Sequence, residues 1–319
     1  MRPLDGHLVV DLTRYLPGAF ASKELLRLGA RVVRLEPPDG DPLRRVAPAW
    51  DHALNAGKES VACDLKADAL FGRALIRRAD VVLEGFRPGV AARLGVGPDD
   101  VPESTVYCSI TGFGMAGVHA GRAGHDLNYA GWAGVLADTA PSPPPVQVAD
   151  LAAGALTAVM EILAALIERA RTGRGARLVV SMTHGTHRLA AHRLRGEPFP
   201  RLLTGGLACY RIYETADERW LTVAALEEVF FRRLCELIAR PDLAARQYGA
   251  DQDTLADELA EVFASRPLAA WLDLFEGEDV SVGPVATLEE AARDFGEHAA
   301  GEAPPPGAHT DAWRAELGF

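Results

Sequence analysis

The chain has 319 residues, of which 48% are hydrophobic and 24% charged, with a formal net charge of −11. This composition is typical of a globular protein long enough for two domains, and the excess of carboxylates argues against nonspecific nucleic-acid binding. Because no apolar run reaches about eighteen residues and no signal-peptide core is present, we expect a cytoplasmic protein without a membrane span.

Short apolar runs alternate with helical patterns along the first two thirds of the chain. Strands are predicted at 8–12, 31–36, 61–65, 81–83, 106–110 and 178–180, and helices at 19–28, 67–78 and 150–170. Strands alternating with helices predict an α/β fold with a doubly wound, mostly parallel sheet. A GxGxxG turn is missing after the first strand, which disfavours a nicotinamide dehydrogenase.

The charge and the pattern change near residue 200. Residues 1–100 carry 15 Lys and Arg against 14 Asp and Glu, whereas residues 202–319 carry 9 against 23. Two strands at 210–213 and 220–224 are expected to pair across a turn, followed by mainly helical patterns. We therefore expect a large domain over 1–200, completed by 286–319, and a small α+β domain over 201–285.

No stretch of the chain predicts a metal site. His184, His187 and His192 lie in a basic segment without nearby carboxylates or cysteines, which is typical of a solvated helix face. The four cysteines are scattered, with no pair at zinc-binding spacing. An anionic ligand would prefer the near-neutral first part of the chain, where Phe86 and Arg87 follow a predicted strand and Arg93 lies close behind.

A glycine-rich stretch, Gly121 to Asn128, contains His125 and Asp126 at the start of a helical pattern, and Asp150 follows downstream. Taken alone, His125 is more often a turn residue than a functional one, and Asp126 is an ordinary helix-entry acid. Asp150 begins the predicted long helix, so an N-cap and a functional carboxylate are equally good interpretations. These residues gain meaning from the rest of the chain.

Nearly the whole sequence resembles the family III CoA-transferases together with the α-methylacyl-CoA racemases. The blocks that carry the resemblance are Pro3 to Gly6, Leu28 to Ala30, Arg34 to Pro37, Asn55 to Ser60, Ala79 to Pro88, Thr111 to Gly114, Gln147 to Asp150 and Thr172 to Gly175. The resemblance implies a large domain and a small domain in an interlocked homodimer. It also implies an acyl-CoA thioester as the substrate.

Within this family, the resemblance favours the racemase branch. Racemases carry a histidine at the position of His125, and racemase-like members share Thr204-Gly205-Gly206 and Ala225-Leu226-Glu227. Inverting the α-carbon of a thioester requires a base on one face and an acid on the other, and His125 and Asp150 are the expected pair. By resemblance, Glu227 orients His125, Asp126 acts near Asp150, and no metal or cofactor beyond coenzyme A is needed.

The enolate oxygen would be stabilised by backbone N–H groups at a helix start, for which we expect the helix at Asp150. Arg87, Arg93, Phe86 and Lys58 are the candidates for binding coenzyme A, whereas Pro37 stands where family members often have an arginine. Two alternatives stay open: a CoA-transferase in which Asp150 is the nucleophile and His125 has no required role, and an inactive CoA-binding dimer.

Overall fold

The computed structural model describes residues 2–297 and 301–319, which form two compact units. Within the described residues, the large unit comprises 2–192 and 301–319, and the small unit comprises 193–297. The sequence placed the domain limits at 200 and 285. In the structure, residues 193–200 and 286–297 group with the small unit, so the segment that returns to the large unit is shorter than expected.

Six parallel strands form the sheet of the large unit, in the order β3-β2-β1-β4-β5-β6. They are β1 (Leu8–Asp11), β2 (Arg31–Glu36), β3 (Glu59–Ala62), β4 (Val81–Glu84), β5 (Val106–Thr111) and β6 (Arg177–Ser181). Val10 pairs with Val33 on one side and with Val82 on the other, so β1 and β4 lie side by side at the centre. This order is that of a doubly wound sheet, and the predicted α/β fold class is confirmed.

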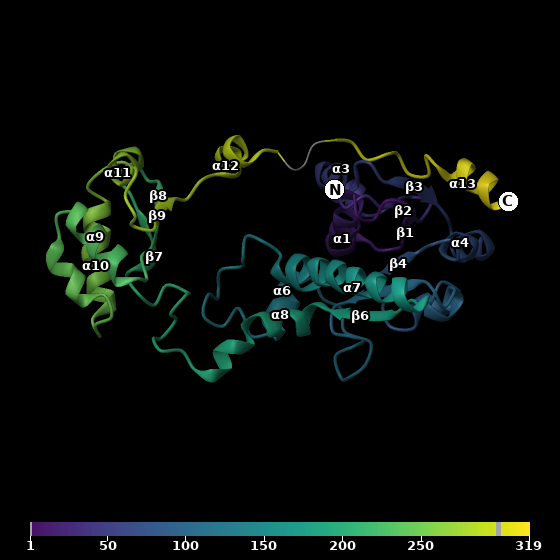
Figure 1. Cartoon of the computed structure of the whole chain (residues 1–319), viewed down its shortest axis with the longest axis horizontal. Coiled ribbons are helices and arrows are strands. Elements are labelled where there is room, and N and C mark those ends of the chain that lie inside the picture. The colour runs from purple at the N-terminus through teal and green to yellow at the C-terminus, as the bar shows by residue number, and fades with distance from the viewer. Residues whose placement is uncertain (1, 298–300) are drawn as a thin grey trace. The chain divides into compact units, whose positions relative to one another are not determined.

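Helices cover both faces of this sheet (Figure 1). They are α1 (Tyr15–Arg27), α2 (Leu43–Val46), α3 (Pro48–Asn55), α4 (Ala69–Ile76), α5 (Val90–Arg93), η1 (Pro98–Asp100), α6 (Asp126–Trp132), the π-helical η2 (Ala149–Leu156), α7 (Thr157–Thr172), α8 (Met182–Ala190) and α13 (Thr310–Leu317). The short helix η3 (Ala191–Arg195) follows α8.

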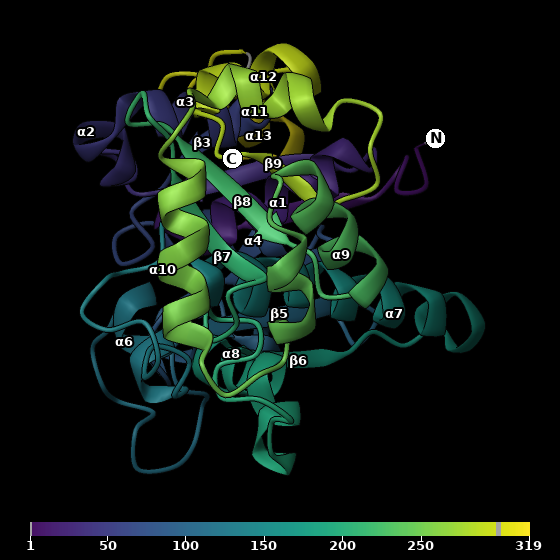
Figure 2. The same cartoon turned by 90° about the vertical axis from the view of Figure 1, so that its left-hand side faces the viewer.

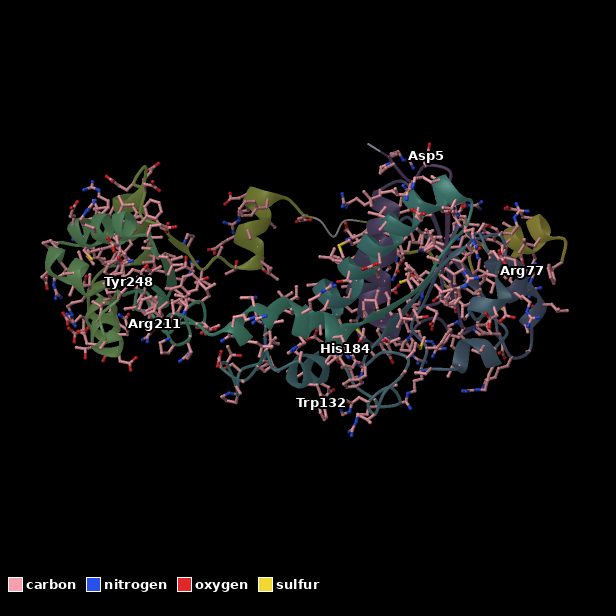
Figure 3. The ribbon with its side chains drawn as sticks, turned by 60° about the horizontal axis from the view of Figure 1, so that its bottom comes forward. Asp5, Arg77, Trp132, His184, Arg211 and Tyr248 are labelled. Carbon is pink, nitrogen blue, oxygen red and sulfur yellow. The ribbon has the colours of Figure 1, made fainter. Side chains whose placement is uncertain are left out.

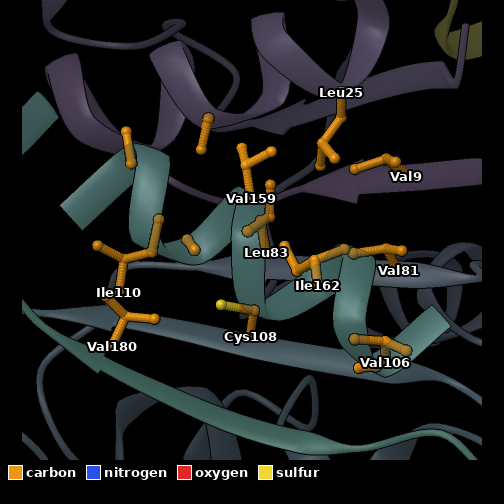
Figure 4. Close-up of a cluster of buried hydrophobic side chains, with 14 of the residues drawn as sticks. Val9, Leu25, Val81, Leu83, Val106, Cys108, Ile110, Val159, Ile162 and Val180 are labelled. Carbon is orange, nitrogen blue, oxygen red and sulfur yellow. The ribbon is translucent and has the colours of Figure 1, made fainter. Parts of the chain in front are cut away.

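Helices α1 and α7 bury one face of the sheet, where Leu25, Leu83 and Ile162 are fully buried (Figure 4). Helices α4, α5 and α13 bury the other face, around Phe71 and Trp313. Because the central strands are buried on both faces, their sequences are continuous apolar runs rather than alternating ones. The core therefore runs through the centre of the sheet and leaves the ends of the strands for other roles.

The predicted long helix consists of two parts, since the π-helical η2 leads directly into α7. By length and composition alone, the combined segment Ala149–Thr172 could cross a membrane, and half of its apolar window is buried inside the protein. Its buried side packs on the sheet, as expected of a core helix in a globular protein. Single π-helical turns are frequent at functional sites.

The C-terminal segment completes the large unit. Trp313 of α13 is 1% exposed, and its indole N–H donates to the Glu59 carboxylate at 2.7 Å. The Ser60 N–H donates to the His309 ring at 3.1 Å, so residues beyond 301 are fixed against β3. This is the return to the large domain that the sequence predicts for the end of the chain.

A buried ionic cluster supports the first two strands on the side of α2 and α3. Arg34 is 3% exposed and contacts Asp51 at 2.8 Å and Asp41 at 3.2 Å. Arg44 binds Glu36 at 2.7 Å in the same cluster. Burial of so many charges is tolerated because opposite charges and hydrogen bonds surround each of them.

Lys58 lies beside this cluster and is also buried, at 3% exposure. Its ammonium group donates to the Ala19 carbonyl at 2.8 Å, the Ser22 hydroxyl at 2.7 Å and the Asn55 side chain at 2.8 Å. The Ser22 hydroxyl donates in turn to Asp11 at the end of β1. All three N–H donors of Lys58 are therefore used within the protein interior.

The small unit contains a three-stranded antiparallel sheet in the order β7-β8-β9 (Figure 2). Its elements are β7 (Tyr210–Glu214), β8 (Trp220–Ala224), α9 (Glu228–Leu237), η4 (Pro241–Arg246), α10 (Gln252–Phe263), α11 (Leu268–Phe275), β9 (Val282–Pro284) and α12 (Leu288–Phe295). Tyr213 pairs with Leu221, as the predicted hairpin requires. Phe231, Phe263 and Trp271 form the centre of its core.

Replacing Lys58 by methionine is expected to destabilise the large unit. The substitution leaves three buried acceptors without their donor and Asp11 without a nearby cation, at a cost of about 3 kcal/mol in the free energy of unfolding. Urea denaturation measures this change. Lys66→Met, at an exposed lysine, is the matched control and should change the stability by less than about 0.5 kcal/mol. Equal effects of the two substitutions would contradict the structural role of Lys58.

Candidate active site

A cavity of about 370 Å³ opens at the carboxyl ends of the central strands of the large unit. Its walls come from the segment after β1 (13–18), the segment after β4 (85–88), the end of β5 (110–113) and the loop before α6 (120–125). Strands β1 and β4 are neighbours at the centre of the sheet. After β1 the chain continues to β2 on one side of this pair, and after β4 it continues to β5 on the other side. Ligands of doubly wound folds bind at this switch point.

His125 directly precedes α6 and is fixed through its backbone. Its N–H donates to the Asn128 side chain at 3.1 Å, and its carbonyl accepts the N–H groups of Asn128 at 2.8 Å and Tyr129 at 3.1 Å. The imidazole is exposed and lines the cavity, with its ring edge-on to Tyr15 at 6.2 Å between centroids. The helix start predicted here positions the ring beside open space.

Tyr129 holds the loop that carries His125. Its hydroxyl donates to the Gly124 carbonyl, and its ring covers two glycines. A Cβ atom on Gly112 would lie 2.4 Å from the Tyr129 ring, and one on Gly124 would lie 2.7 Å from it. Both positions therefore need glycine, because any side chain there would displace the tyrosine and with it the residue before His125.

Asp150 lines the same cavity from a different helix, η2, and is 9% exposed. Its backbone N–H donates to the Asp126 carboxylate at 2.9 Å. Burial raises the pKa of Asp150 to about 7, and the negative charge of Asp126 contributes to the same shift. The carboxyl group can therefore be protonated or ionised near neutral pH.

The sequence left two interpretations of Asp150, and the structure shows how its helix begins. The helix starts at Ala149, so Asp150 lies inside it rather than at the N-cap position. Asp126 supplies the carboxylate that accepts an N–H of the first turn. The Asp150 side chain is thereby left to face the cavity, and its N–H is not available to a ligand.

Phe86 and Arg87 line the cavity, as expected for residues that follow β4. The buried carboxylate of Glu84 accepts the Phe86 N–H at 2.7 Å and so fixes the turn after the strand. Arg14 and Arg122 also line the cavity and were missed by the sequence reasoning. Arg14 could have been found, since it follows β1 as Arg87 follows β4.

The remaining predicted site residues lie elsewhere. Arg93 is exposed at the end of α5 and does not line the cavity, and Lys58 is held in the interior by the hydrogen bonds described above. Glu227 is an exposed residue of the small unit, at the position before α9. The structure brings together His125, Asp150, Phe86 and Arg87, and it places Asp126 directly behind Asp150.

A second cavity of about 280 Å³ adjoins the first, since Thr13, Arg14 and Phe86 line both. Pro37 and Lys66 line only the second cavity of these two. Lys66 was not singled out from the sequence, although it follows the carboxyl end of β3, where ligands of such sheets bind. Its exposed ammonium group is a cation available to an anionic ligand, unlike that of Lys58.

The described part of the chain contains no cluster of three or more His, Cys, Asp or Glu side chains suited to a metal ion. All four cysteines are buried and free, and burial raises the pKa of the Cys108 thiol to about 12. The site thus brings together an imidazole, on the residue before α6, and a carboxyl group, on η2.

Comparison with known proteins identifies the family. The model of CoA-transferase family III matches residues 4–302. The α-methylacyl-CoA racemase of Mus musculus is 35% identical over 308 residues, covering 90% of this chain and 79% of that protein. The acetyl-CoA:oxalate CoA-transferase of Acetobacter aceti is 33% identical over 322 residues, covering 91% of this chain and 82% of that protein.

Solved structures have the same fold. A CaiB/BaiF family protein from Brucella suis superimposes with a TM-score of 0.84 at 27% identity, covering 99% of each chain. Rv3272 from Mycobacterium tuberculosis gives a TM-score of 0.83 at 28% identity, covering 98% of this chain and 99% of that one. With a family match over nearly its whole length and a fold shared from end to end, the chain belongs to CoA-transferase family III.

Proposed function

We propose that the protein is an acyl-CoA racemase that inverts the α-carbon of a 2-methylacyl-CoA type of thioester. The observation that carries the proposal is the pair of proton-exchanging groups, His125 and Asp150, in one cavity. They come from separate segments, the loop before α6 and the helix η2, so they can approach one carbon from two sides. The similarity to racemases over 90% of the chain supports the same activity.

The reaction needs one base and one acid whose roles exchange with the direction of turnover. One group removes the α-proton, the electron pair of the C–H bond moves into the thioester carbonyl, and an enolate forms. The other group then returns a proton to the opposite face. The pKa of Asp150, at about 7, suits both roles near neutral pH. The imidazole of His125 has a ring nitrogen that can accept a proton and one that can donate it.

Backbone N–H groups are proposed to stabilise the enolate oxygen. The helix start at Asp150, which the sequence suggested, is a poor source because Asp126 accepts the Asp150 N–H. The first turn of α6, directly after His125, is the better one, because the His125 carbonyl accepts only the Asn128 and Tyr129 N–H groups and leaves those of Asp126 and Leu127 for a ligand. The enolate would then form beside His125.

Coenzyme A is proposed to bind across the two adjoining cavities. Arg14, Arg87 and Lys66 supply cations for its phosphates, and Phe86 offers an aromatic surface for its base. Pro37 lines the second cavity, at the position where family members often have an arginine. In this cavity the positive charge for a phosphate therefore comes from Lys66 and Arg14. No cofactor beyond the coenzyme A of the substrate enters this scheme.

We also propose that the protein acts as an interlocked homodimer in which Glu227 orients His125. The large unit has apolar side chains in solvent along one helix, at Leu156, Met160 and Ile167, which are 48%, 53% and 68% exposed. A partner chain would cover such residues.

A CoA-transferase is the second candidate, since the sequences of known transferases are also similar to this chain over about nine tenths of its length. In that reaction the Asp150 carboxylate attacks the thioester carbonyl, and the thiolate of coenzyme A leaves, giving an acyl anhydride of the aspartate. The carboxylate is available, but His125 then has no chemical role in a cavity that it lines. This is why the racemase is preferred.

Single substitutions of the pair are expected to separate proton exchange from inversion. In deuterated water, wild type should place deuterium on the α-carbon of both enantiomers and invert them. His125→Gln and Asp150→Asn should each lower inversion by about a thousandfold. Because each variant keeps one base, it should still exchange the α-proton of one enantiomer. The enantiomer that exchanges should differ between the two variants. NMR and chiral chromatography of the product acids measure both events.

His184→Gln is the matched control, at an exposed histidine outside the catalytic cavity (Figure 3). It should leave exchange and inversion unchanged. An acyl or coenzyme A adduct on Asp150, formed by wild type without α-deuterium, would establish the transferase instead. Binding of the ester with neither event would indicate an inactive CoA-binding protein.

Asp126→Asn is expected to shift the pH dependence of the reaction. The amide oxygen can still accept the Asp150 N–H, but the negative charge that helps raise the pKa of Asp150 is gone. The pKa of Asp150 should therefore fall, and the limb of the kcat/KM profile that reports it should move to lower pH by about one pH unit. An unchanged profile would show that Asp126 does not tune Asp150.

Asp150→Asn should also change stability in a pH-dependent way. The pKa of Asp150 lies above the ordinary value of 3.8, so the folded protein binds this proton more tightly than the unfolded chain does. The free energy of unfolding of wild type consequently falls as pH rises from about 4 to about 7. The variant has no carboxyl group at this position and does not show this fall. Chemical denaturation should show the variant gaining on the order of 2 kcal/mol relative to wild type between pH 4.5 and 8.

The fully exposed Asp253, at 97% side-chain exposure, provides the control substitution Asp253→Asn. Its stability difference from wild type should be the same at both pH values. A constant difference for Asp150→Asn as well would mean that the buried carboxyl group is not destabilised by ionisation.

A further inference from the structure

The proposed binding of coenzyme A leaves one arginine of the catalytic cavity, Arg122, without a role. Arg14, Arg87 and Arg122 line this cavity, against the single carboxylate of Asp150. Arg14 also lines the second cavity, and Arg87 also lines a third cavity of about 270 Å³. Among these three cavities, Arg122 lines only the catalytic one, so it is the arginine most closely tied to the reacting end.

Arg122 is held by packing rather than by a carboxylate. Its guanidinium lies 5.3 Å from the ring centroid of Trp132, and the backbone N–H of Arg122 donates to the His119 carbonyl at 2.9 Å. The ring centroid of His119 lies 4.4 Å from that of the same Trp132, so the loop is anchored on this side chain. Within residues 2–297 and 301–319, no Asp or Glu forms an ion pair with Arg122. The guanidinium of Arg122 is therefore available to bind an anionic ligand.

Tyr15 presents a second polar group in the same cavity, next to His125. Its backbone lies in the left-handed region, with φ at +63°, which is costly for a bulky side chain. The Tyr15 N–H donates to Asp41 at 3.2 Å, and Asp41 belongs to the buried ionic cluster through Arg34. The core thus enforces a conformation that keeps the half-exposed phenol at the cavity wall.

We infer that the acyl group of the substrate carries a carboxylate, which Arg122 and Tyr15 bind at the reacting end of the cavity. The inference rests on the proposed function, because the acid–base pair places the α-carbon beside His125, three residues after Arg122. A guanidinium presents paired N–H donors that match a carboxylate, and the phenol adds an O–H donor. Ile110, Phe113 and Met182 leave an apolar wall for the methylene groups. The substrate class is the mono-CoA thioester of a 2-methyl dicarboxylic acid.

Two esters that differ in one group test this assignment. In 2-methylglutaryl-CoA with the thioester next to the methyl-bearing carbon, a carboxylate ends the acyl chain, and in 2-methylpentanoyl-CoA a methyl group replaces it. Calorimetry on wild type should give a Kd about ten- to hundredfold lower for the carboxylated ester. Arg122→Gln should abolish the difference, Arg122→Lys should retain part of it, and Tyr15→Phe should reduce it by about threefold.

Arg171→Gln, at an arginine with 72% side-chain exposure on α7, is the control and should preserve the wild-type preference. Equal Kd values for the two esters in wild type would overturn the inference. So would an equal loss of affinity for both esters in Arg122→Gln, because Arg122 would then contact coenzyme A. The α-deuterium assay separates the two proposals: a binding preference without exchange defeats the racemase alone, and exchange without a preference defeats the carboxylate site alone.

Discussion

One hydrogen bond, from the Asp150 N–H to the Asp126 carboxylate, links the two candidate acid–base groups. Asp126 follows His125 directly in the chain, so the bond fixes the start of η2 against the start of α6. It also contributes the negative charge that helps raise the pKa of Asp150. This contact therefore helps to position the pair, and its negative charge adds to the effect of burial on the pKa of Asp150.

The rest of the large unit holds this contact in place. The segments that follow the neighbouring strands β1 and β4 lead to opposite sides of the sheet, and the cavity lies between these two segments. Glu84 fixes the turn at Phe86, and the buried ionic cluster fixes the strained backbone at Tyr15. Arg34 does not line the cavity, but its ion pair with Asp41 supports the wall at Tyr15.

The sequence predicts the sheet well, because strands buried on both faces appear as apolar runs and each is bounded by turn residues. It also predicts that His125 lies at a helix start, since Gly124 and the pattern after Asp126 indicate one. It could not separate Lys58 from Lys66, because burial depends on how α1 and α3 pack and not on local sequence. The capping of η2 by Asp126 was equally hidden, since it joins residues 24 positions apart.

In the proposed racemase reaction, His125 and Asp150 act on opposite faces of one carbon. The most direct measurement is a crystal structure of the protein with a non-reactive acyl-CoA analogue that carries the α-carbon. We expect this carbon to lie between the imidazole and the Asp150 carboxyl group, each within about 3.5 Å and on opposite faces. Both groups on one face, or the Asp150 oxygen aligned with the thioester carbonyl carbon and His125 turned away, would contradict it.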